Sequence, residues 1–328
     1  MNDVRRAART RTGWWPHVIV RPEKRWRIVI APRYAAPVLI VFNPTAGAGR
    51  RRRLARALDA LAARGLRPEL AETRAPGHAS VLAREAAGRG VAVVVAAGGD
   101  GTIAEVAAGL AGSTAAMGVL PLGTANVLAC ELGLPPSPGR AAEVLATGRV
   151  ARLHPGFARF ADGRSRLFVQ MLGAGFDAAV VAHLDLALKH RVGRAAYVWQ
   201  SLREMRRYRF PAIAAELDGV TCQAASVIVT KGQFYAGRYR IAPAARPGEP
   251  GLQVVVFRHP GALQAALAGA ALLLGLVPHL PGVEIVAARR ICLSAAGEVP
   301  VQADGDPAGS LPVEVTDAAE PLRILLPR

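Results

Sequence analysis

Three short apolar runs, each followed by a turn that carries glycine, limit most strongly the folds open to this chain. They cover residues 38–42, 91–97 and 117–121, and segments with helical spacing separate them. This alternation is typical of βα units built around a mostly parallel sheet. Because the carboxyl ends of parallel strands meet at one edge of such a sheet, we expect the three turns to line a single ligand crevice.

Strands dominate the sequence after residue 150. Asp218-Gly219 is typical of a hairpin turn between two of them. We therefore predict an α/β N-terminal domain with a mostly parallel sheet over residues 37–150, followed by a β-rich antiparallel sandwich domain over residues 151–300. The strands predicted for the second domain cover residues 166–172, 211–217, 223–231, 252–257, 283–287 and 290–295.

Two predicted helices interrupt the strands of the second domain. One covers residues 178–209 and is expected to break near Gly193, and the other covers residues 261–277. The second helix has 16 largely apolar residues between Gly261 and Pro278, whereas a membrane-spanning helix needs ~20. We therefore expect a buried or interfacial helix at this place.

The chain is strongly basic. Its 328 residues include 41 Lys and Arg against 24 Asp and Glu, which gives a net charge of +17. Anionic partners are therefore expected: nucleic acid, acidic lipid or phosphorylated small molecules. Aromatic residues make up only 5% of the chain and are not interleaved with the basic ones, unlike in proteins that read single-stranded nucleic acid. We therefore expect no specific nucleic-acid partner.

Basic residues gather at two places. Residues 1–36 form an extension with nine Lys and Arg and the tryptophans Trp14, Trp15 and Trp26. This extension is either an arm that rests on anionic lipid, with its tryptophans at the level of the headgroups, or a solvated tail. The second group falls within 21 residues and comprises Lys189, Arg191, Arg194, Arg203, Arg206, Arg207 and Arg209.

The cysteines give no sign of a cross-linked or zinc-binding protein. Cys130, Cys222 and Cys292 lack CxxC spacing, which argues against a disulfide framework and against a zinc site. No apolar signal region follows the early arginines either. We therefore expect a cytoplasmic protein.

The segment Gly98-Gly99-Asp100-Gly101-Thr102 has the properties of an anion site. Glycine lets a phosphate approach the backbone, and the N-terminus of the following helix offers unpaired N–H groups. Thr102 and Glu105 predict a capping box, with Thr102 as the N-cap residue. A carboxylate beside phosphates is repulsive unless a divalent cation lies between them, so Asp100 predicts Mg²⁺. The alternative is a tight turn in which Asp100 bonds its own backbone.

Four further segments accompany Gly98 to Thr102 with Glu105: Asn43-Pro44-Thr45-Ala46-Gly47, Pro121 to Asn126, Gly173 to Asp177 and Asp304-Gly305-Asp306. Together these segments resemble the motifs of the diacylglycerol kinase catalytic family, which includes bacterial lipid kinases and the sphingosine and ceramide kinases. The resemblance runs from residue 37 to the end of the chain, in the family's order and spacing. The GGDGT segment alone would also fit NAD kinases and phosphofructokinases, whereas no GxxxxGK[ST] P-loop sequence is present.

The resemblance implies an ATP-dependent lipid kinase that uses Mg²⁺. The first domain would hold the nucleotide in a phosphofructokinase-like crevice, the second would hold the lipid, and residues 301–328 would return to the first domain. Asp100 is the expected metal ligand. The residues expected to contact the nucleotide are Asn43, Thr73, Gly98, Gly99, Asp100, Gly101, Thr102, Ile103, Ala104, Gly123, Thr124 and Asn126.

The family's C-terminal Asp-Gly-Glu motif supplies the base that takes the proton of the substrate hydroxyl. Here the motif reads Asp304-Gly305-Asp306, so we expect Asp306 to be the base, Asp304 to support it and Asp100 to act with Mg²⁺ on the phosphates. Asp is about 1.3 Å shorter than Glu, and a misplacement of ~1 Å can cost ~10²-fold in rate. The alternative is that Asp304-Gly305 only makes a hairpin turn.

A second departure from the family lies in the loop before residue 252. Family members commonly place an Asp directly before the glycine that corresponds to Gly251, where it binds a structural Mg²⁺. This chain has Pro250 there, and Glu249 is displaced by one position. The chain therefore departs from the family at that metal site.

A two-chain lipid cannot leave a bilayer at a useful rate, so a kinase for such a lipid must visit the membrane. The expected partners are ATP, a membrane lipid and an anionic membrane surface, with the protein peripheral to the inner face of the membrane. Diacylglycerol is the acceptor expected first, while sphingoid, ceramide-like and phosphatidylglycerol-type acceptors stay open, as does a homodimer. The alternatives in function are a GGDGT kinase for a soluble substrate and a catalytically weak, membrane-associated lipid-binding homologue.

Overall fold

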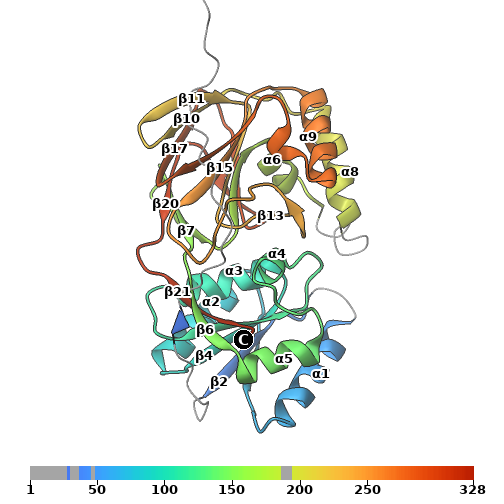
Figure 1. Cartoon of the computed structure of the whole chain (residues 1–328), viewed down its shortest axis with the longest axis vertical. Coiled ribbons are helices and arrows are strands. Elements are labelled where there is room, and N and C mark those ends of the chain that lie inside the picture. The colour runs from blue at the N-terminus through green and yellow to red at the C-terminus, as the bar shows by residue number, and fades with distance from the viewer. Residues whose placement is uncertain (1–27, 30–36, 46–48, 186–193) are drawn as a thin grey trace, which may run out of the picture.

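The computed structural model describes residues 28–29, 37–45, 49–185 and 194–328. The chain forms two domains that lie end to end (Figure 1). The predictions for the basic extension fall outside the described residues except at the short strand β1, and so do those for Lys189, Arg191 and residues 46–48.

A seven-stranded sheet forms the centre of the first domain. Its order is β1-β6-β21-β5-β4-β2-β3, and β21, β5, β4, β2 and β3 pair in parallel. Parallel strands with both faces covered have continuous apolar sequences, as β2, β4 and β5 do, whereas the edge strand β3 is mostly exposed. The strands are β1 (Ile28–Val29), β2 (Val38–Phe42), β3 (Glu69–Glu72), β4 (Val93–Gly98), β5 (Ala116–Pro121), β6 (Arg149–Leu153) and β21 (Leu322–Leu326).

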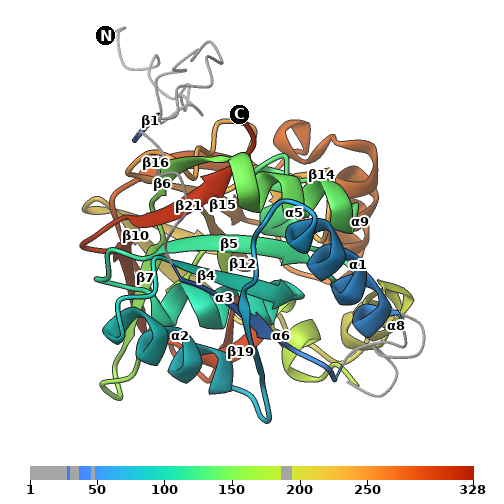
Figure 2. The same ribbon diagram turned by 90° about the horizontal axis from the view of Figure 1, so that it is seen from below.

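Helices cover both faces of this sheet. Leu54 and Leu145 pack with Ile40 on one face, and Ala83 and Val106 pack with core residues of the other. Figure 2 shows α1 and α5 on one side of the sheet and α2 and α3 on the opposite side. The helices are α1 (Arg50–Ala62), α2 (His78–Gly88), α3 (Asp100–Gly109), α4 (Val127–Glu131) and α5 (Pro138–Thr147).

The second domain is a sandwich of two six-stranded antiparallel sheets, which confirms the predicted fold class. Their orders are β11-β10-β17-β20-β7-β8 and β16-β15-β12-β9-β18-β19, and β13 and β14 form a small separate sheet. The strands are β7 (Gly156–Phe160), β8 (Ser165–Phe168), β9 (Met171–Gly175), β10 (Ile213–Leu217), β11 (Val220–Ala224), β12 (Ser226–Thr230), β13 (Phe234–Tyr235), β14 (Tyr239–Arg240), β15 (Leu252–Phe257), β16 (Val283–Ala288), β17 (Arg290–Ala295), β18 (Pro300–Ala303), β19 (Asp306–Ser310) and β20 (Val313–Asp317).

Alternate residues of the β12 sheet point to two different cores. Val227 and Val229 face the other sheet of the sandwich, whereas Ile228 faces a smaller apolar cluster outside it. That outer cluster includes Ala271 and Val277 from the helical layer. The layer consists of α6 (Phe176–Ala182), α8 (Arg194–Met205), α9 (Ala262–Leu274) and the 3₁₀ turn η1 (Val277–His279). None of the helices in the described part of the chain has the length and apolar character needed to cross a membrane.

Three boundaries differ from those expected. The predicted strands 166–172 and 223–231 are each two strands, because turns at residues 169–170 and 225 interrupt them. The C-terminal segment rejoins the first domain only at β21 and not from residue 301, because β18, β19 and β20 belong to the sheets of the sandwich.

The predicted capping box is wrong. Helix α3 begins at Asp100, two residues before the expected N-cap residue. The Glu105 carboxylate instead accepts hydrogen bonds from the backbone N–H groups of Gly77 (2.8 Å) and Ala79 (3.0 Å). Glu105 therefore caps the start of the neighbouring helix α2, a long-range role that a local sequence pattern cannot reveal.

Candidate active site

A cavity of about 930 Å³ lies between the two domains. Its first-domain wall is formed by the turns that follow β2, β4 and β5, as the sequence predicts. Its second-domain wall includes the β18–β19 hairpin and helices α6, α8 and α9. The predicted site residues that line it are Asn43, Gly99, Asp100, Gly101, Thr102, Ile103, Gly123, Thr124, Asp304 and Asp306.

Four predicted nucleotide residues are not part of the cavity wall: Thr73, Gly98, Ala104 and Asn126. Gly98 and Asn126 lie next to the cavity wall and support its turns: Gly98 packs against Thr102 of the second turn, and Asn126 bonds Gly123 of the third. The backbone N–H of Thr73 donates to the carbonyl of Phe42 at 2.8 Å, and Ala104 is buried within α3. Their contacts with nucleotide stay predictions.

The second and third turns pack backbone to backbone. A Cβ at Gly123 would lie 2.5 Å from the Cα of Gly99, so only glycine fits at residue 123. Asn126, with φ 47°, fixes this turn: its Oδ1 accepts the N–H of Gly123 at 2.9 Å, and its Nδ2 donates to the Gly123 carbonyl at 2.8 Å. The result is a floor with almost no side-chain bulk, which a phosphate can approach closely.

Asn43 joins the first turn to the second. Its Nδ2 donates to Oγ1 of Thr102 at 3.1 Å, and its Oδ1 accepts the N–H and hydroxyl of Thr45 at 3.0 and 2.7 Å. Thr102 in turn lies so close to Gly98 that a Cβ at Gly98 would come within 2.4 Å of its Oγ1. The first two turns are therefore one hydrogen-bonded unit.

Asp100 connects the second turn to the third. Its Oδ1 accepts the backbone N–H of Val127 at 2.6 Å, and its Oδ2 accepts that of Asn126 at 2.9 Å. Burial raises the pKa of this carboxyl, and these hydrogen bonds oppose the rise. Asp100 thus bonds the backbone of the third turn, which neither interpretation anticipates. It also bonds its own backbone N–H, as the local-turn alternative expects, and its metal role stays a prediction.

Two arginines of α1 bring positive charge to the crevice. Arg50 and Arg53 both line the cavity, and Arg50 Nη2 would lie 3.6 Å from a Cβ at Gly99. Arg53 donates to the Pro121 carbonyl at 2.7 Å, and burial together with its charge lowers the pKa of Arg50. Neither arginine was among the predicted site residues, although the run of basic residues from Arg50 to Arg53 directly after the first turn indicated positive charge at the crevice.

The Asp304 carboxylate is held by three backbone N–H groups. It accepts them from Val169 (2.8 Å), Gln170 (2.8 Å) and Met171 (3.0 Å). Burial raises the pKa of Asp304 to about 6, with a smaller contribution from the charge of Asp100, while the three hydrogen bonds oppose this rise. Its φ of 51° places it in the left-handed region, so it does form a hairpin turn, and that turn delivers it to the cavity.

Asp306 lies directly over the glycine turn. A Cβ at Gly101 would be 3.1 Å from Oδ2 of Asp306, and Arg166 Nη2 is 3.8 Å from the same oxygen. The side chain is 44% exposed, whereas both carboxylate oxygens of Asp304 accept backbone N–H groups. Asp306 is therefore the carboxylate of the hairpin that is more open to a molecule in the cavity.

A third carboxyl, that of Asp177, lies deeper in the cavity. It accepts hydrogen bonds from the hydroxyl of Tyr235 and from Nε2 of Gln302, the latter at 2.8 Å. Oε1 of Gln302 accepts the N–H of Gly305 at 2.8 Å. Burial raises the pKa of Asp177, and the two hydrogen bonds lower it. This network links the Asp304-Gly305-Asp306 hairpin to the second-domain part of the cavity.

Glu131 joins the two domains and was missed in the sequence analysis. It ends α4 in the first domain, and its Oε2 accepts the backbone N–H groups of Gln233 (2.8 Å) and Phe234 (3.1 Å) of the second domain. No local pattern marks such an interdomain contact.

The part of the cavity beyond Asp177 is apolar. It is bounded by α6, α8 and α9, and its lining includes Phe176, Val180, Val181, Leu202, Met205, Phe210, Ile228, Ile241, Leu272, Leu273 and Val277. A polar, glycine-lined crevice and an apolar chamber thus meet at the carboxylates of the hairpin.

Known families match both domains. The model of the diacylglycerol kinase catalytic domain matches residues 37–158, and that of the YegS C-terminal NAD kinase beta sandwich-like domain matches residues 170–326. The chain belongs to the diacylglycerol kinase catalytic family. Membership in this family supports a phosphotransferase activity for the protein. It also confirms the resemblance of the sequence motifs.

Individual relatives agree with this placement. A "Probable lipid kinase YegS-like" of Pseudomonas fluorescens is 30% identical over 261 residues, 76% of this chain and 84% of the relative. A "Diacylglycerol kinase" of Bacillus subtilis is 25% identical over 297 residues, 88% of this chain and 96% of the relative. A solved structure from Bacillus anthracis str. Sterne matches the fold with a TM-score of 0.72 at 21% identity, covering 89% of this chain and 97% of that one.

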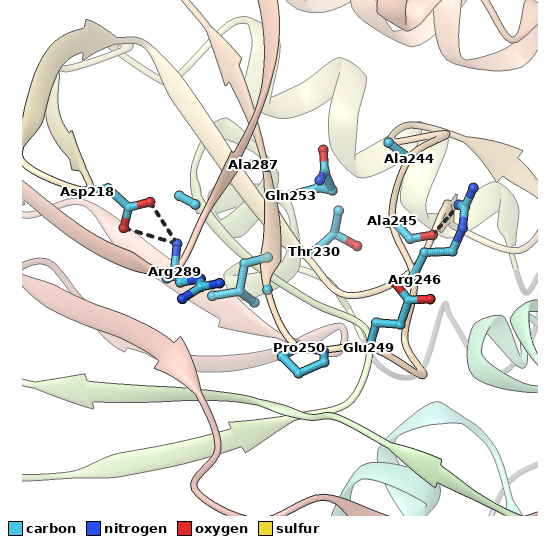
Figure 3. Close-up of a pocket in the computed structure, with 13 residues that line it drawn as sticks. Asp218, Thr230, Ala244, Ala245, Arg246, Glu249, Pro250, Gln253, Ala287 and Arg289 are labelled. Atoms are coloured by element: carbon cyan, nitrogen blue, oxygen red, sulfur yellow. Dashed lines mark hydrogen bonds between the residues drawn. The ribbon is translucent and has the colours of Figure 1, made fainter. Parts of the chain in front are cut away.

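The residues of this chain do not fit the family's structural metal site in the loop before β15. The ammonium group of Lys231, whose side chain is fully buried, lies among oxygens of that loop: it donates to the carbonyls of Gly251 (2.7 Å) and Glu249 (3.2 Å) and to Oδ1 of Asp317 (2.6 Å). Pro250 offers no carboxylate. Figure 3 shows Glu249 and Pro250 with Thr230 at the pocket beside this loop. A lysine thus supplies the positive charge here.

Burial lowers the pKa of Lys231, and the hydrogen bond to Asp317 opposes that change. The three donors of its ammonium group match three oxygen acceptors within hydrogen-bond distance, as a buried charge requires. Oδ2 of Asp317 also accepts the N–H of Gly251 at 2.5 Å. Lys231 and Asp317 thus hold this loop by hydrogen bonds.

Proposed function

We propose that this protein transfers the γ-phosphate of ATP to a lipid hydroxyl group, with diacylglycerol as the expected acceptor and phosphatidic acid as the product, at the cytoplasmic face of a membrane. One observation carries the proposal. The glycine-lined crevice and the apolar chamber belong to one cavity, and Asp306 lies where they meet, beside Gly101. A phosphate donor and a molecule with an acyl chain can therefore share the cavity.

The donor set at Asp100 suits Mg²⁺. Proteins commonly hold this ion through one or two carboxylates, with water and substrate phosphates as the other ligands. Asp100 lines the cavity and presents its carboxylate beside the glycine turn, and a carboxylate oxygen can bind a metal ion while it also accepts an N–H bond. The described residues contain no cluster of three or more His, Cys, Asp or Glu suited to a metal, so nucleotide and water would complete the shell. When bound, the ion would neutralise charge on the phosphates.

The chemistry asks the protein mainly for alignment. The backbone N–H groups at the start of α3 would hold the phosphates of ATP, with Arg50 and Arg53 near their negative charge. Asp306 would accept the proton of the lipid hydroxyl as its oxygen forms a bond to the γ-phosphorus. The bond from that phosphorus to the β–γ bridging oxygen breaks, and ADP leaves with the electron pair. Asp304, fixed by three N–H groups, keeps the hairpin in register.

The proposal is tested by incubating the protein with ATP labelled at the γ-phosphate, Mg²⁺ and anionic vesicles made from a lipid extract, and by identifying any labelled product by mass. We expect one phosphorylated lipid, which Asp306→Ala abolishes. Asp162→Ala is the matched control, because Asp162 is an exposed carboxylate that pairs only locally with Arg164. It should leave the rate unchanged.

Other outcomes would support the alternatives. Transfer to a soluble acceptor without any need for vesicles would indicate a GGDGT kinase for a soluble substrate. Vesicle binding without transfer to any acceptor would indicate a lipid-binding homologue, an outcome that the shorter side chain of Asp306 makes worth testing. A labelled sphingoid or ceramide in place of diacylglycerol would keep the reaction and change the acceptor.

A further inference from the structure

Helix α9 is apolar on all sides and yet lies at the surface. Its 13 residues include one polar residue, Gln264, and only Ala271 is buried. Leu263, Leu273 and Leu274 are 71%, 64% and 72% exposed. A helix that is apolar all round is normally buried in a core or in a membrane. Within the described part of the chain, only one side of α9 packs against other apolar residues, around Ala271 and Leu272.

Helix α8 extends the same surface. It contacts α9, and it exposes Val198, Trp199 and Leu202 at 62%, 62% and 49%. Both views show the two helices on the outer side of the second domain (Figures 1 and 2). We call this surface the α8–α9 face and define it by Val198, Trp199, Leu202, Leu263, Leu267, Leu273, Leu274 and Leu276.

The exposed large apolar side chains of the described residues are concentrated at this place. Eight of these eleven side chains belong to the α8–α9 face. The other three are scattered: Leu70 lies in β3, Val81 in α2 and Val220 in β11. Scattered apolar residues are ordinary, whereas a contiguous apolar patch marks an interaction surface.

The charges around the face identify the partner. Arg203, Arg206, Arg207 and Arg209 follow the apolar residues of α8 and are exposed, while Glu204 among them is buried and bonded to Gln200. Helix α9 carries no charge. Apolar residues bordered by arginines suit a bilayer surface with anionic headgroups. A symmetric dimer through this face would gather the arginines of both copies at one interface, and α9 has no acidic residue to pair with them.

The face is also a wall of the cavity. Val198, Leu202 and Leu273 are exposed at the surface and line the cavity at the same time. The apolar chamber therefore reaches the α8–α9 face between the two helices.

From these observations we propose that the α8–α9 face docks on an anionic bilayer and that a lipid acyl chain enters the cavity from the membrane between α8 and α9. The inference rests on the proposed function, because it names the route by which the lipid reaches Asp306. It accounts for an apolar helix that is neither buried nor long enough to span a membrane: α9 lies in the interface.

Trp199 provides a direct test of docking. The chain has four tryptophans, three of them at residues 14, 15 and 26, so a full-length variant with phenylalanine at those three positions reports from Trp199 alone. On phosphatidylglycerol vesicles that contain brominated lipid, we expect quenching and a blue shift of its emission, and both should be much weaker on phosphatidylcholine vesicles. Unchanged emission on both kinds of vesicle would overturn the proposal.

A second test uses Leu263→Gln with Leu274→Gln, two exposed positions that do not line the cavity. In the docked protein both leucines would be buried in the bilayer, so replacing them with glutamine should weaken vesicle binding by at least about 10-fold. Turnover of long-chain diacylglycerol in vesicles should fall with it, while turnover of a dispersed short-chain diacylglycerol stays unchanged. The matched control is Leu70→Gln with Val81→Gln, exposed apolar positions on the first domain, which should bind and turn over as the wild type does.

The outcomes separate docking from function. Quenching of Trp199 with no phosphorylation of any lipid supports docking and contradicts the proposed kinase activity. Full vesicle binding and turnover in the leucine variant overturns the docking face even if the protein is a lipid kinase. A wild-type dimer in sedimentation that becomes a monomer in the leucine variant overturns it as well, because a second copy would then cover the face.

Discussion

The carboxylate of Asp306 lies against Gly101, so that a Cβ at Gly101 would come within 3.1 Å of its Oδ2. These residues belong to different domains and are 205 positions apart in the chain. The contact brings the expected base to the turn that is expected to hold the phosphates.

Gly101→Ala should therefore impair catalysis more than folding. The added methyl group would displace the Asp306 carboxylate by a few tenths of an ångström and crowd the phosphate crevice, and such shifts cost roughly 10–100-fold in kcat. The thermal midpoint should hardly change, because the alanine suits the first turn of α3. Steady-state kinetics and a melting curve check this. Gly88→Ala, at the exposed end of α2 with open space around it, is the control, and an equal loss in both variants would contradict the account.

Asp304 should make stability depend on pH. Its pKa is raised from 3.8 to about 6 in the folded protein, so between these values the folded state binds more protons than the unfolded state. This tighter proton binding stabilises the folded state. The stabilisation is complete below pH 4 and is lost as the pH rises through 6. The free energy of unfolding of the wild type minus that of Asp304→Asn should fall by roughly 3 kcal/mol between pH 4 and pH 7. Denaturant titrations at both pH values measure it, and a difference that is the same at both would show that Asp304 does not titrate there.

Lys231→Met should destabilise the second domain strongly. It removes the buried ammonium group that Asp317 and two carbonyl groups bond. Breaking a fully buried ion pair costs about 3–5 kcal/mol, and because the side chain of Asp317 is 23% exposed we expect a loss at the lower end of that range. Arg290→Met is the control, because the ion pair of Arg290 with Glu314 is exposed and should contribute less than about 1 kcal/mol. Urea unfolding curves give both values.

A metal chelator gives a separate test of the Lys231 loop. Because Lys231 takes the place of a structural cation, the melting temperature without nucleotide should be the same with chelator and with added Mg²⁺. A melting temperature that falls with chelator and recovers with Mg²⁺ would show that a metal holds this loop after all.

Glu105→Ala should destabilise the fold through α2. The substitution leaves the N–H groups of Gly77 and Ala79 without their carboxylate, a loss typical of a helix cap at about 1–2 kcal/mol. The effect should add to that of Thr102→Ala, since Thr102 bonds Asn43 instead. A double-mutant cycle with a coupling energy above about 0.5 kcal/mol would favour the rejected capping box.

The sequence predicts those parts of the fold that local patterns control. Continuous apolar runs placed β2, β4 and β5, and the glycine turns after them placed the crevice, because parallel strands end at one edge. Asp304 and Asp306 were found through a motif. Arg53, Glu105 and Glu131 were missed or misassigned because their partners lie 26 to 103 residues away, where periodicity carries no information. The sequence did not predict that α9 is exposed, because a helix buried in a core and a helix that lies in a membrane surface can have the same apolar sequence.

We propose above that Asp306 is the base of an ATP-dependent lipid phosphotransferase. The most direct test compares kcat for diacylglycerol in anionic vesicles between the wild type, Asp306→Ala and Asp306→Glu, with folding checked by circular dichroism. Removing a general base costs typically 10²–10⁴-fold, so the alanine variant should lose about that much. The glutamate variant, which restores the family's side chain, should keep turnover at or above the wild-type value. Equal turnover in the alanine variant and the wild type would contradict the claim.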